Sequence, residues 1–171
     1  SKEVRKKLDL GDDLSFIYVG GFHEEKRLDL LIDAFLKLRK KYENIKLILI
    51  GDGPTRVHVE KQIEESGDRN ILYLGRIIDG VDAYFAAADC LVLPGVGGLA
   101  LNQAMYWKKL CVVSEADGTE DDLVIEEKSG YRFSKGDLES LTEAMERRIN
   151  EEPGKLAEME ENARQLIVEK S

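Results

Sequence analysis

The sequence is poor in the residues that cross-link or rigidify small proteins. Its 171 residues include two cysteines and three prolines, and aromatic residues make up only 7%. Both cysteines, Cys90 and Cys111, lie within apolar runs, which predicts small core residues in a reducing compartment and not a disulfide or a ligand set. A chain of this length buries enough surface to fold as one domain without disulfides or metals.

Long hydrophobic segments are also missing. Uninterrupted apolar runs such as residues 47–50 stop far short of the roughly 20 residues that a membrane-spanning helix needs. No basic and then apolar start indicates a secretory signal. We therefore expect a cytoplasmic protein.

Positive charge is scarce relative to negative charge. The formal net charge is −9 and the isoelectric point is about 4.9. A nucleic-acid-binding domain usually shows a basic surface, so this balance predicts no DNA or RNA partner. It also argues against polybasic attachment to anionic lipid by this part of the chain. No set of His, Cys, Asp and Glu residues has metal-ligand spacing, and we expect no metal.

What the sequence does contain is an alternation of two kinds of segment. Short apolar runs, most of them closed by glycine, predict strands covered on both faces at residues 16–20, 47–51, 71–75, 90–95 and 110–113, with a sixth edge strand at 130–133. Amphipathic spacing predicts helices at 25–42, 55–66, 80–88, 99–108 and 120–127, with two more after residue 137, separated by a break at 151–154. The fold class is α/β: one Rossmann-like, doubly wound parallel sheet of about six strands with helices on both faces, over residues 1–171.

The expected carboxyl ends of the strands, where open parallel sheets bind ligands, are rich in glycine. The relevant residues are Gly20 and Gly21, Gly51 and Gly53, Gly75 before Arg76, and Gly95, Val96, Gly97 and Gly98 before a helix starting near Leu99. Any single glycine is explained equally well by a tight turn. Three glycines within residues 95–98, beside a helix N-terminus that can hold a phosphate, favour a ligand. Neither the G-x-G-x-x-G fingerprint nor a P-loop is present, which excludes NAD enzymes and P-loop NTPases.

Several of these segments resemble one family in the right order. Residues 16–26, with Lys26, resemble the opening of the donor domain in the large retaining glycosyltransferase family of GT-B fold. Residues 28–35 resemble the helix that follows, residues 51–54 its "GdGp" turn, and residues 87–94 its "aDvfvlPs" strand. Residues 99–105 resemble its "GLvvlEAM" helix, and Ser129 to Tyr131 resemble the start of its final strand.

The resemblance implies a role for each of these residues. Lys26 would contact the diphosphate of a nucleoside-diphosphate sugar beside Gly20 and Gly21. Residues Gly95, Val96, Gly97, Gly98 and Leu99 would lie against the phosphates and the transferred sugar, Gln103 would lie near the ribose, and Arg76 and Ile77 beside the base. The chain would be the C-terminal half of a two-domain enzyme that needs no metal cofactor. Its partners would be the nucleotide-sugar donor, a separate N-terminal acceptor domain and a saccharide or lipid-linked acceptor used in polysaccharide or glycoconjugate assembly. The full-length protein could lie at the inner face of a membrane, with any membrane contact made through the other half.

The chain also departs from the family pattern. The family arginine falls at Gly21, and its two glutamates fall at Gly95 and Gln103, so no catalytic residue is assigned. A non-catalytic nucleotide-sugar-binding or scaffold domain therefore stays an alternative. A response-regulator-like module would need clustered acidic residues at the strand ends, for which Asp52 and Asp89 are the candidates. His23 could approach the donor or be a solvated loop residue.

Overall fold

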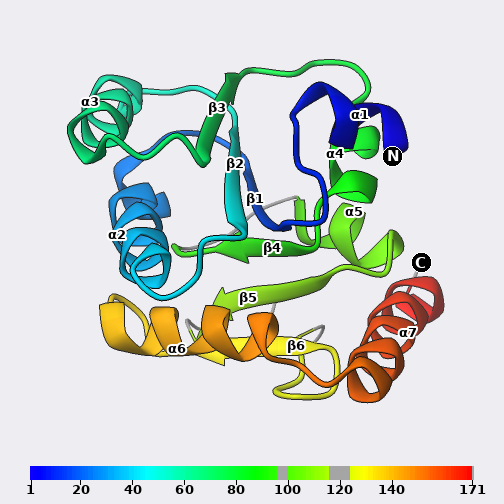
Figure 1. Ribbon diagram of the computed structural model, residues 1–171. Coiled ribbons are helices and arrows are strands. Elements are labelled where there is room, and N and C mark those ends of the chain that lie inside the picture. The colour runs from blue at the N-terminus through cyan, green and yellow to red at the C-terminus, as the bar shows by residue number, and fades with distance from the viewer. Residues whose placement is uncertain (96–99, 116–123, 171) are drawn as a thin grey trace.

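Six parallel strands form a single sheet at the centre of the molecule (Figure 1). The computed structural model describes residues 1–95, 100–115 and 124–170. The strands are β1 (Leu14–Val19), β2 (Ile45–Ile50), β3 (Ile71–Gly75), β4 (Cys90–Leu93), β5 (Leu110–Ser114) and β6 (Gly130–Phe133), in the order β3-β2-β1-β4-β5-β6. This is the doubly wound order of dinucleotide-binding folds, and the predicted fold class is confirmed.

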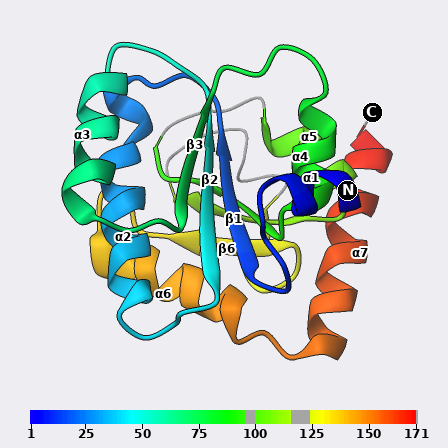
Figure 2. The same ribbon diagram turned by 45° about the horizontal axis from the view of Figure 1, so that its top comes forward.

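Helices cover both faces of the sheet (Figure 2). On one face lie α2 (Leu28–Arg39), α3 (Arg56–Ser66) and α6 (Leu138–Ile149), and on the other lie α1 (Lys2–Lys7), α4 (Val81–Ala87), α5 (Ala100–Tyr106) and α7 (Pro153–Lys170). Because neither face meets water, every residue of β4 and β5 is buried. Their continuous apolar runs in the sequence follow from this double covering.

The cysteines belong to this core. Cys90 and Cys111 are both fully buried free thiols, which confirms the prediction that they are core residues. Burial raises the pKa of the Cys90 thiol to about 12. In the part of the chain that the structure describes, no helix is long and apolar enough to cross a membrane.

Two predictions of helices need correction, and one helix lies where none was predicted. The helix predicted at 25–42 is divided into the 3₁₀ turn η1 (Glu24–Lys26) and α2, because Arg27 adopts a left-handed conformation with φ 55° and ψ 44°. The helix predicted at 120–127 is wrong for residues 124–127, where Glu126 forms a bridge to Gly130; residues 120–123 lie outside the described ranges. Helix α1 was not predicted, because it is short and buries only Val4.

Candidate functional site

The strand order creates a reversal between β1 and β4. The chain winds outward from β1 through β2 to β3 and then returns to the other side of β1 with β4. Connections after β1 and β4 therefore leave toward opposite faces, which opens a crevice beyond their carboxyl ends. Gly20 and Gly21 follow β1 and Gly95 closely follows β4, so predicted ligand-binding residues lie on both sides of this switch point.

The neighbouring strand ends approach each other closely through glycine. The Gly20 N–H donates to Ile50 O at 3.0 Å, and the Gly51 N–H donates to Gly75 O at 2.9 Å. Gly51 has a φ of 144°, and a Cβ atom there would lie 1.8 Å from Gly20 O. Only glycine fits at this position, so the chain after β2 packs backbone against backbone on the chain after β1.

Lys26 and Gly95 meet across the switch point. A Cβ atom on Gly95 would lie 2.0 Å from Glu25 O and 2.5 Å from Lys26 Cα. The loop after β4 therefore lies directly against η1, which brings together two residues that the sequence predicts as ligand-binding. The same contact closes position 95 to any side chain unless the backbone moves, so a glutamate does not fit there in this arrangement.

The loop after β1 is held by hydrogen bonds from three directions. The Tyr18 hydroxyl donates to Gly21 O at 2.7 Å, and burial raises the pKa of Tyr18 above its ordinary value. The Phe22 N–H donates to Asp52 O at 2.9 Å, and Phe22 O accepts from the Thr55 N–H at 2.9 Å. Residues 20–23 are consequently positioned before any ligand binds.

The imidazole of His23 lies over Gly21. A Cβ atom on Gly21 would lie 2.7 Å from His23 Cδ2 and 2.8 Å from His23 Nε2. The histidine ring thus fills the space in which a side chain at residue 21 would begin. His23 is exposed at its outer side.

Arg76 and Ile77 lie farther along the same edge. They follow β3, which stands three strand spacings of about 4.8 Å from β4. Arg76 is exposed, and Ile77 is partly buried against the core. The Gly53 N–H, which donates to the Asp52 carboxylate, lowers the pKa of Asp52, and the nearby Arg56 and Arg76 lower it further.

The remaining predicted residues belong to the segment after β4. Gln103 is half-buried in the middle of α5, on the face of the sheet opposite α2. Val96, Gly97, Gly98 and Leu99 lie outside the described residues. The described part of the predicted site is therefore the crevice lined by Gly20, Gly21, Lys26 and Gly95, with Arg76 and Ile77 toward the sheet edge.

A groove of about 850 Å³ lies between α2 and α3. Its lining residues include His23, Glu24 and Arg27, which precede α2, and Pro54, Thr55 and His58, which lie before and on α3. Nothing in the sequence pattern indicated this groove, because its residues are scattered polar ones without a shared period. His58 is exposed on α3, as expected for a surface histidine.

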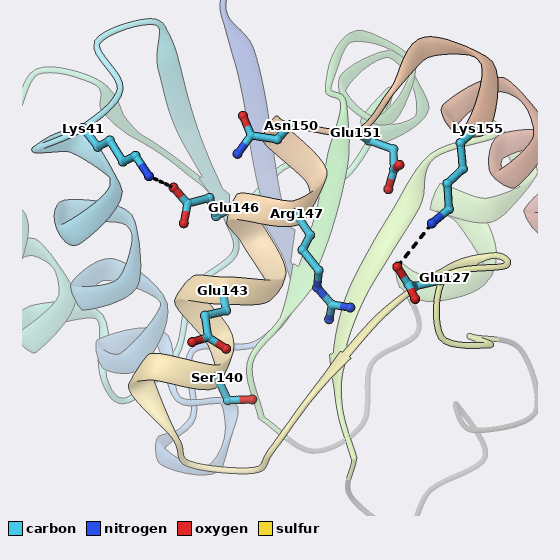
Figure 3. Close-up of a pocket in the computed structure, with 9 residues that line it drawn as sticks. All are labelled: Lys41, Glu127, Ser140, Glu143, Glu146, Arg147, Asn150, Glu151 and Lys155. Atoms are coloured by element: carbon cyan, nitrogen blue, oxygen red, sulfur yellow. Dashed lines mark hydrogen bonds and ion pairs between the residues drawn. The ribbon is translucent and has the colours of Figure 1, made fainter.

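A second hollow, of about 820 Å³, lies along α6, away from the carboxyl ends of the strands (Figure 3). Its charged groups are bonded to other protein groups: Lys41 Nζ lies 2.8 Å from Glu146 and Lys155 Nζ 3.2 Å from Glu127. Arg147, which points into the same hollow, pairs with Glu126 at 2.6 Å. Glu143 and Glu151 line the hollow as well, so it offers no surplus of positive charge to a phosphate ligand.

The two acidic candidates of a response-regulator-like site lie at opposite ends of the sheet. Asp52 follows β2 at the carboxyl edge, whereas Asp89 precedes β4 at the amino edge and accepts a hydrogen bond from the Ser15 N–H at 2.8 Å. They cannot form one phosphate-accepting cluster. Within the described ranges, no three His, Cys, Asp or Glu side chains gather in a way that could hold a metal ion.

Two named relatives, a transferase and a synthase, match most of this chain. Alpha-D-kanosaminyltransferase of Streptomyces kanamyceticus is 24% identical over 169 residues, which cover 96% of this chain and 43% of the relative. Alpha-monoglucosyldiacylglycerol synthase of Acholeplasma laidlawii is 28% identical over 140 residues, 78% of this chain and 35% of the relative. The chain spans less than half the length of these relatives.

Solved structures show the same fold. Anabaena Alr3699/HepE in complex with UDP superposes with a TM-score of 0.87 at 21% identity, over 98% of this chain and 47% of that protein. A sequence profile of the family described as glycosyl transferases group 1 matches residues 1–166. The match covers every strand and the glycine-lined crevice, and the chain therefore belongs to the glycosyl transferases group 1 family.

Proposed function

We propose that this chain binds the nucleoside-diphosphate sugar donor of a two-domain, retaining GT-B glycosyltransferase, as its C-terminal half. The observation that carries the proposal is the close contact of Gly95 with the backbone of Lys26, beside the strand end at Gly20 and Gly21, at the switch point of a sheet whose family transfers glycosyl groups. The complexes of Alr3699/HepE with UDP and with UDP-glucose support a nucleotide-sugar donor.

In this proposal the donor lies along the carboxyl edge. The Lys26 ammonium and the backbone beside Gly21 and Gly95 hold the diphosphate, the base lies toward Arg76 and Ile77, and Gln103 bonds the ribose. Preorganised N–H groups beside the phosphates stabilise the charge that develops on the leaving diphosphate. Lys26 and backbone groups take the part that a metal ion plays in other transferases, so no metal cofactor is proposed.

The acceptor belongs to the other half of the protein in this proposal. The relatives include a capsular polysaccharide biosynthesis glycosyltransferase of Staphylococcus aureus and a diacylglycerol-modifying synthase, which supports a saccharide or lipid-linked acceptor. Such acceptors are assembled at the cytoplasmic face of membranes. Membrane contact is assigned to the other half, because this chain carries a net charge of −9.

Nucleotide titration followed by amide chemical shifts tests the donor site. UDP, GDP, ADP and their parent nucleosides are added separately up to millimolar concentration. At least one diphosphate should shift the amides around Gly20, Arg76 and Gly95, and leave those around Lys155 in the α6 hollow unchanged. If no nucleotide shifts the carboxyl-edge amides, the donor site is wrongly assigned.

The isolated chain should not transfer a glycosyl group. Transfer depends on holding donor and acceptor together in a closed site, and the crevice described here supplies one wall of it. The measurement compares this chain with the full-length protein, using the identified donor and a crude acceptor fraction. Transfer by the isolated chain at a rate near that of the full-length protein would overturn the half-enzyme assignment.

A specific observation also favours a second function, a donor-binding domain without catalysis. Position 95 is closed to a side chain, and Gln103 is uncharged, so neither provides the carboxylate that the family pattern implies. The full-length protein distinguishes the two functions. Donor binding with turnover supports the transferase, whereas donor binding without turnover on any acceptor supports the non-catalytic domain.

A further inference from the structure

The charge around the switch point does not match the donor that it is proposed to bind. A nucleoside diphosphate carries at least two negative charges near neutral pH. On η1 the single cation, Lys26, directly follows two carboxylates, Glu24 and Glu25. The whole chain is acidic, with a net charge of −9. A diphosphate at this edge therefore needs a further hydrogen-bond donor close to Lys26.

The side chain best placed to supply it is His23. Its ring atoms Cδ2 and Nε2 stand 2.7 and 2.8 Å from the point where a side chain of residue 21 would begin. Residue 21 directly follows Gly20 at the carboxyl end of β1, on one side of the crevice. The absence of a Cβ atom at Gly21 is what allows an imidazole to occupy this place.

His23 is tied to Lys26 through the backbone. The His23 carbonyl accepts a hydrogen bond from the Lys26 N–H at 3.0 Å, so both residues belong to one 3₁₀ turn. The loop before them is fixed by the Tyr18 bond to Gly21 O and by the Asp52 and Thr55 bonds to the Phe22 backbone. The backbone that carries His23 therefore loses little freedom when a ligand binds.

We propose that His23 binds the donor diphosphate beside Lys26, with its imidazole folded over Gly21 to donate a ring N–H to a phosphate oxygen. The inference rests on the proposed function, since it assigns a residue of the same site. It makes Gly21 and His23 one functional unit. The glycine leaves the space free, and the histidine fills it with a ring N–H that donates a hydrogen bond. No bond is made or broken in this role, which is binding only.

The first test measures the affinity of UDP, and of uridine, for the chain and three single variants by titration calorimetry. The variants are His23→Ala, His23→Gln and, as a matched control, His58→Gln on α3, which lines the same groove as His23. His23→Ala should weaken UDP binding about tenfold and leave uridine binding within about twofold. His23→Gln, which keeps a neutral N–H donor, should lose less, and His58→Gln should bind UDP as the parent chain does.

The second test uses Gly21→Ala, whose methyl group would meet the imidazole. The backbone at residue 21 needs no left-handed conformation, so the variant should fold, and its unfolding midpoint checks this. Gly21→Ala should weaken UDP binding by displacing His23, but should cost little more once His23 is already alanine. That non-additivity distinguishes a shared unit from two independent residues.

Each outcome decides between the proposals. If His23→Ala and Gly21→Ala both bind UDP with the parent affinity, the role of His23 is overturned and the donor site stands. Equal losses of UDP and uridine affinity would also overturn it, because His23 would then not act on the phosphates. If the parent chain binds none of UDP, GDP or ADP, the proposed function fails and this inference fails with it.

Discussion

The two edges of the sheet use charge in different ways. At the amino edge, charged side chains are bonded to the protein itself: the Arg5 guanidinium donates to Ala87 O at 2.5 Å and to Gly11 O and Asp13 O at 2.9 Å. At the carboxyl edge the strand ends meet through glycine and backbone hydrogen bonds, and charged side chains lie at the surface around them. A cluster of charges therefore does not mark the binding site of this fold. The site lies instead at the edge where the strand ends meet through glycine and backbone.

The strongest test of this difference between the edges is to add a methyl group to a glycine at the carboxyl edge. Gly51→Ala places a Cβ atom 1.8 Å from Gly20 O at a residue with φ 144°. Strain and overpacking together should lower the free energy of unfolding by about 3–5 kcal/mol. Urea denaturation measures the loss.

Gly67→Ala is the matched control for this substitution. Gly67 also has a positive φ, 65°, but no atom lies within 4 Å of the added Cβ. We expect a cost of about 1–2 kcal/mol from the left-handed conformation alone. Equal losses in the two variants would show that close approach at Gly51 does not shape the edge.

At the amino edge we expect a substitution to lower the stability of the fold without changing UDP affinity. Arg5→Ala leaves three backbone carbonyls without their guanidinium donor, and Arg5 is itself partly buried. The free energy of unfolding should fall by about 2–3 kcal/mol, with UDP affinity unchanged under conditions where the variant is folded. Arg5→Lys, which keeps the charge but not the planar fork, should recover only part of the stability. A loss of UDP affinity in folded Arg5→Ala would contradict the assignment of function to one edge.

Lys26→Ala should affect binding and leave stability nearly unchanged. A charged hydrogen bond at a partly exposed edge contributes about 1–3 kcal/mol, so UDP affinity should fall on the order of tenfold while uridine affinity is kept. Lys155→Ala in the α6 hollow is the control, because it removes a cation of the same type from a comparable cavity. If Lys155→Ala weakens UDP binding as much, the effect of Lys26 reflects net charge and not contact.

The sequence predicted the features that depend on residues close together in the chain. Strands β4 and β5 were visible because burial on both faces requires unbroken apolar runs, and the carboxyl-edge glycines followed from the parallel order. Helix α2 was found, but its start was placed too early, since the left-handed turn at Arg27 has no signature in apolar spacing. The bridge between Glu126 and Gly130 was not predicted, because the sequence of residues 120–127 is also compatible with a short crossover helix.

The site could be predicted only as a set of separate loops. Gly95 touches the backbone of Lys26, although the two residues are about 70 positions apart in the chain. No local sequence pattern contains a contact between residues so far apart. The same holds for His23, whose place over Gly21 depends on how Tyr18, Asp52 and Thr55 fix the loop. Motif resemblance compensated for this at Lys26, where the family pattern has a lysine. It gave no assignment at His23, where the family pattern supplies no role.

The smallest expected effect concerns two neighbouring glutamates of α7. Burial raises the pKa of Glu160, although Arg148 and Lys109 oppose the shift, while a hydrogen bond from Lys108 lowers the pKa of Glu161. A raised pKa means that the folded state binds more protons than the unfolded chain above about pH 4.5. Glu160 therefore costs stability as the pH rises through the folded pKa. Glu161 contributes stability above the unfolded pKa and loses it as the pH falls through the folded pKa.

Substituting each glutamate by glutamine should separate these signs. Glu160→Gln should equal the parent chain in urea midpoint near pH 4 and exceed it progressively toward pH 7, because the amide never takes the disfavoured charge. Glu161→Gln should also match the parent at low pH but fall below it toward pH 7, and only slightly, since its ion pair with Lys108 is exposed. UDP affinity should stay the same in both variants, because Glu160 lies near Asp89 and Lys109, at the amino ends of β4 and β5, and Glu161 is its neighbour. Two curves with the same slope would show that burial does not govern the charge of Glu160.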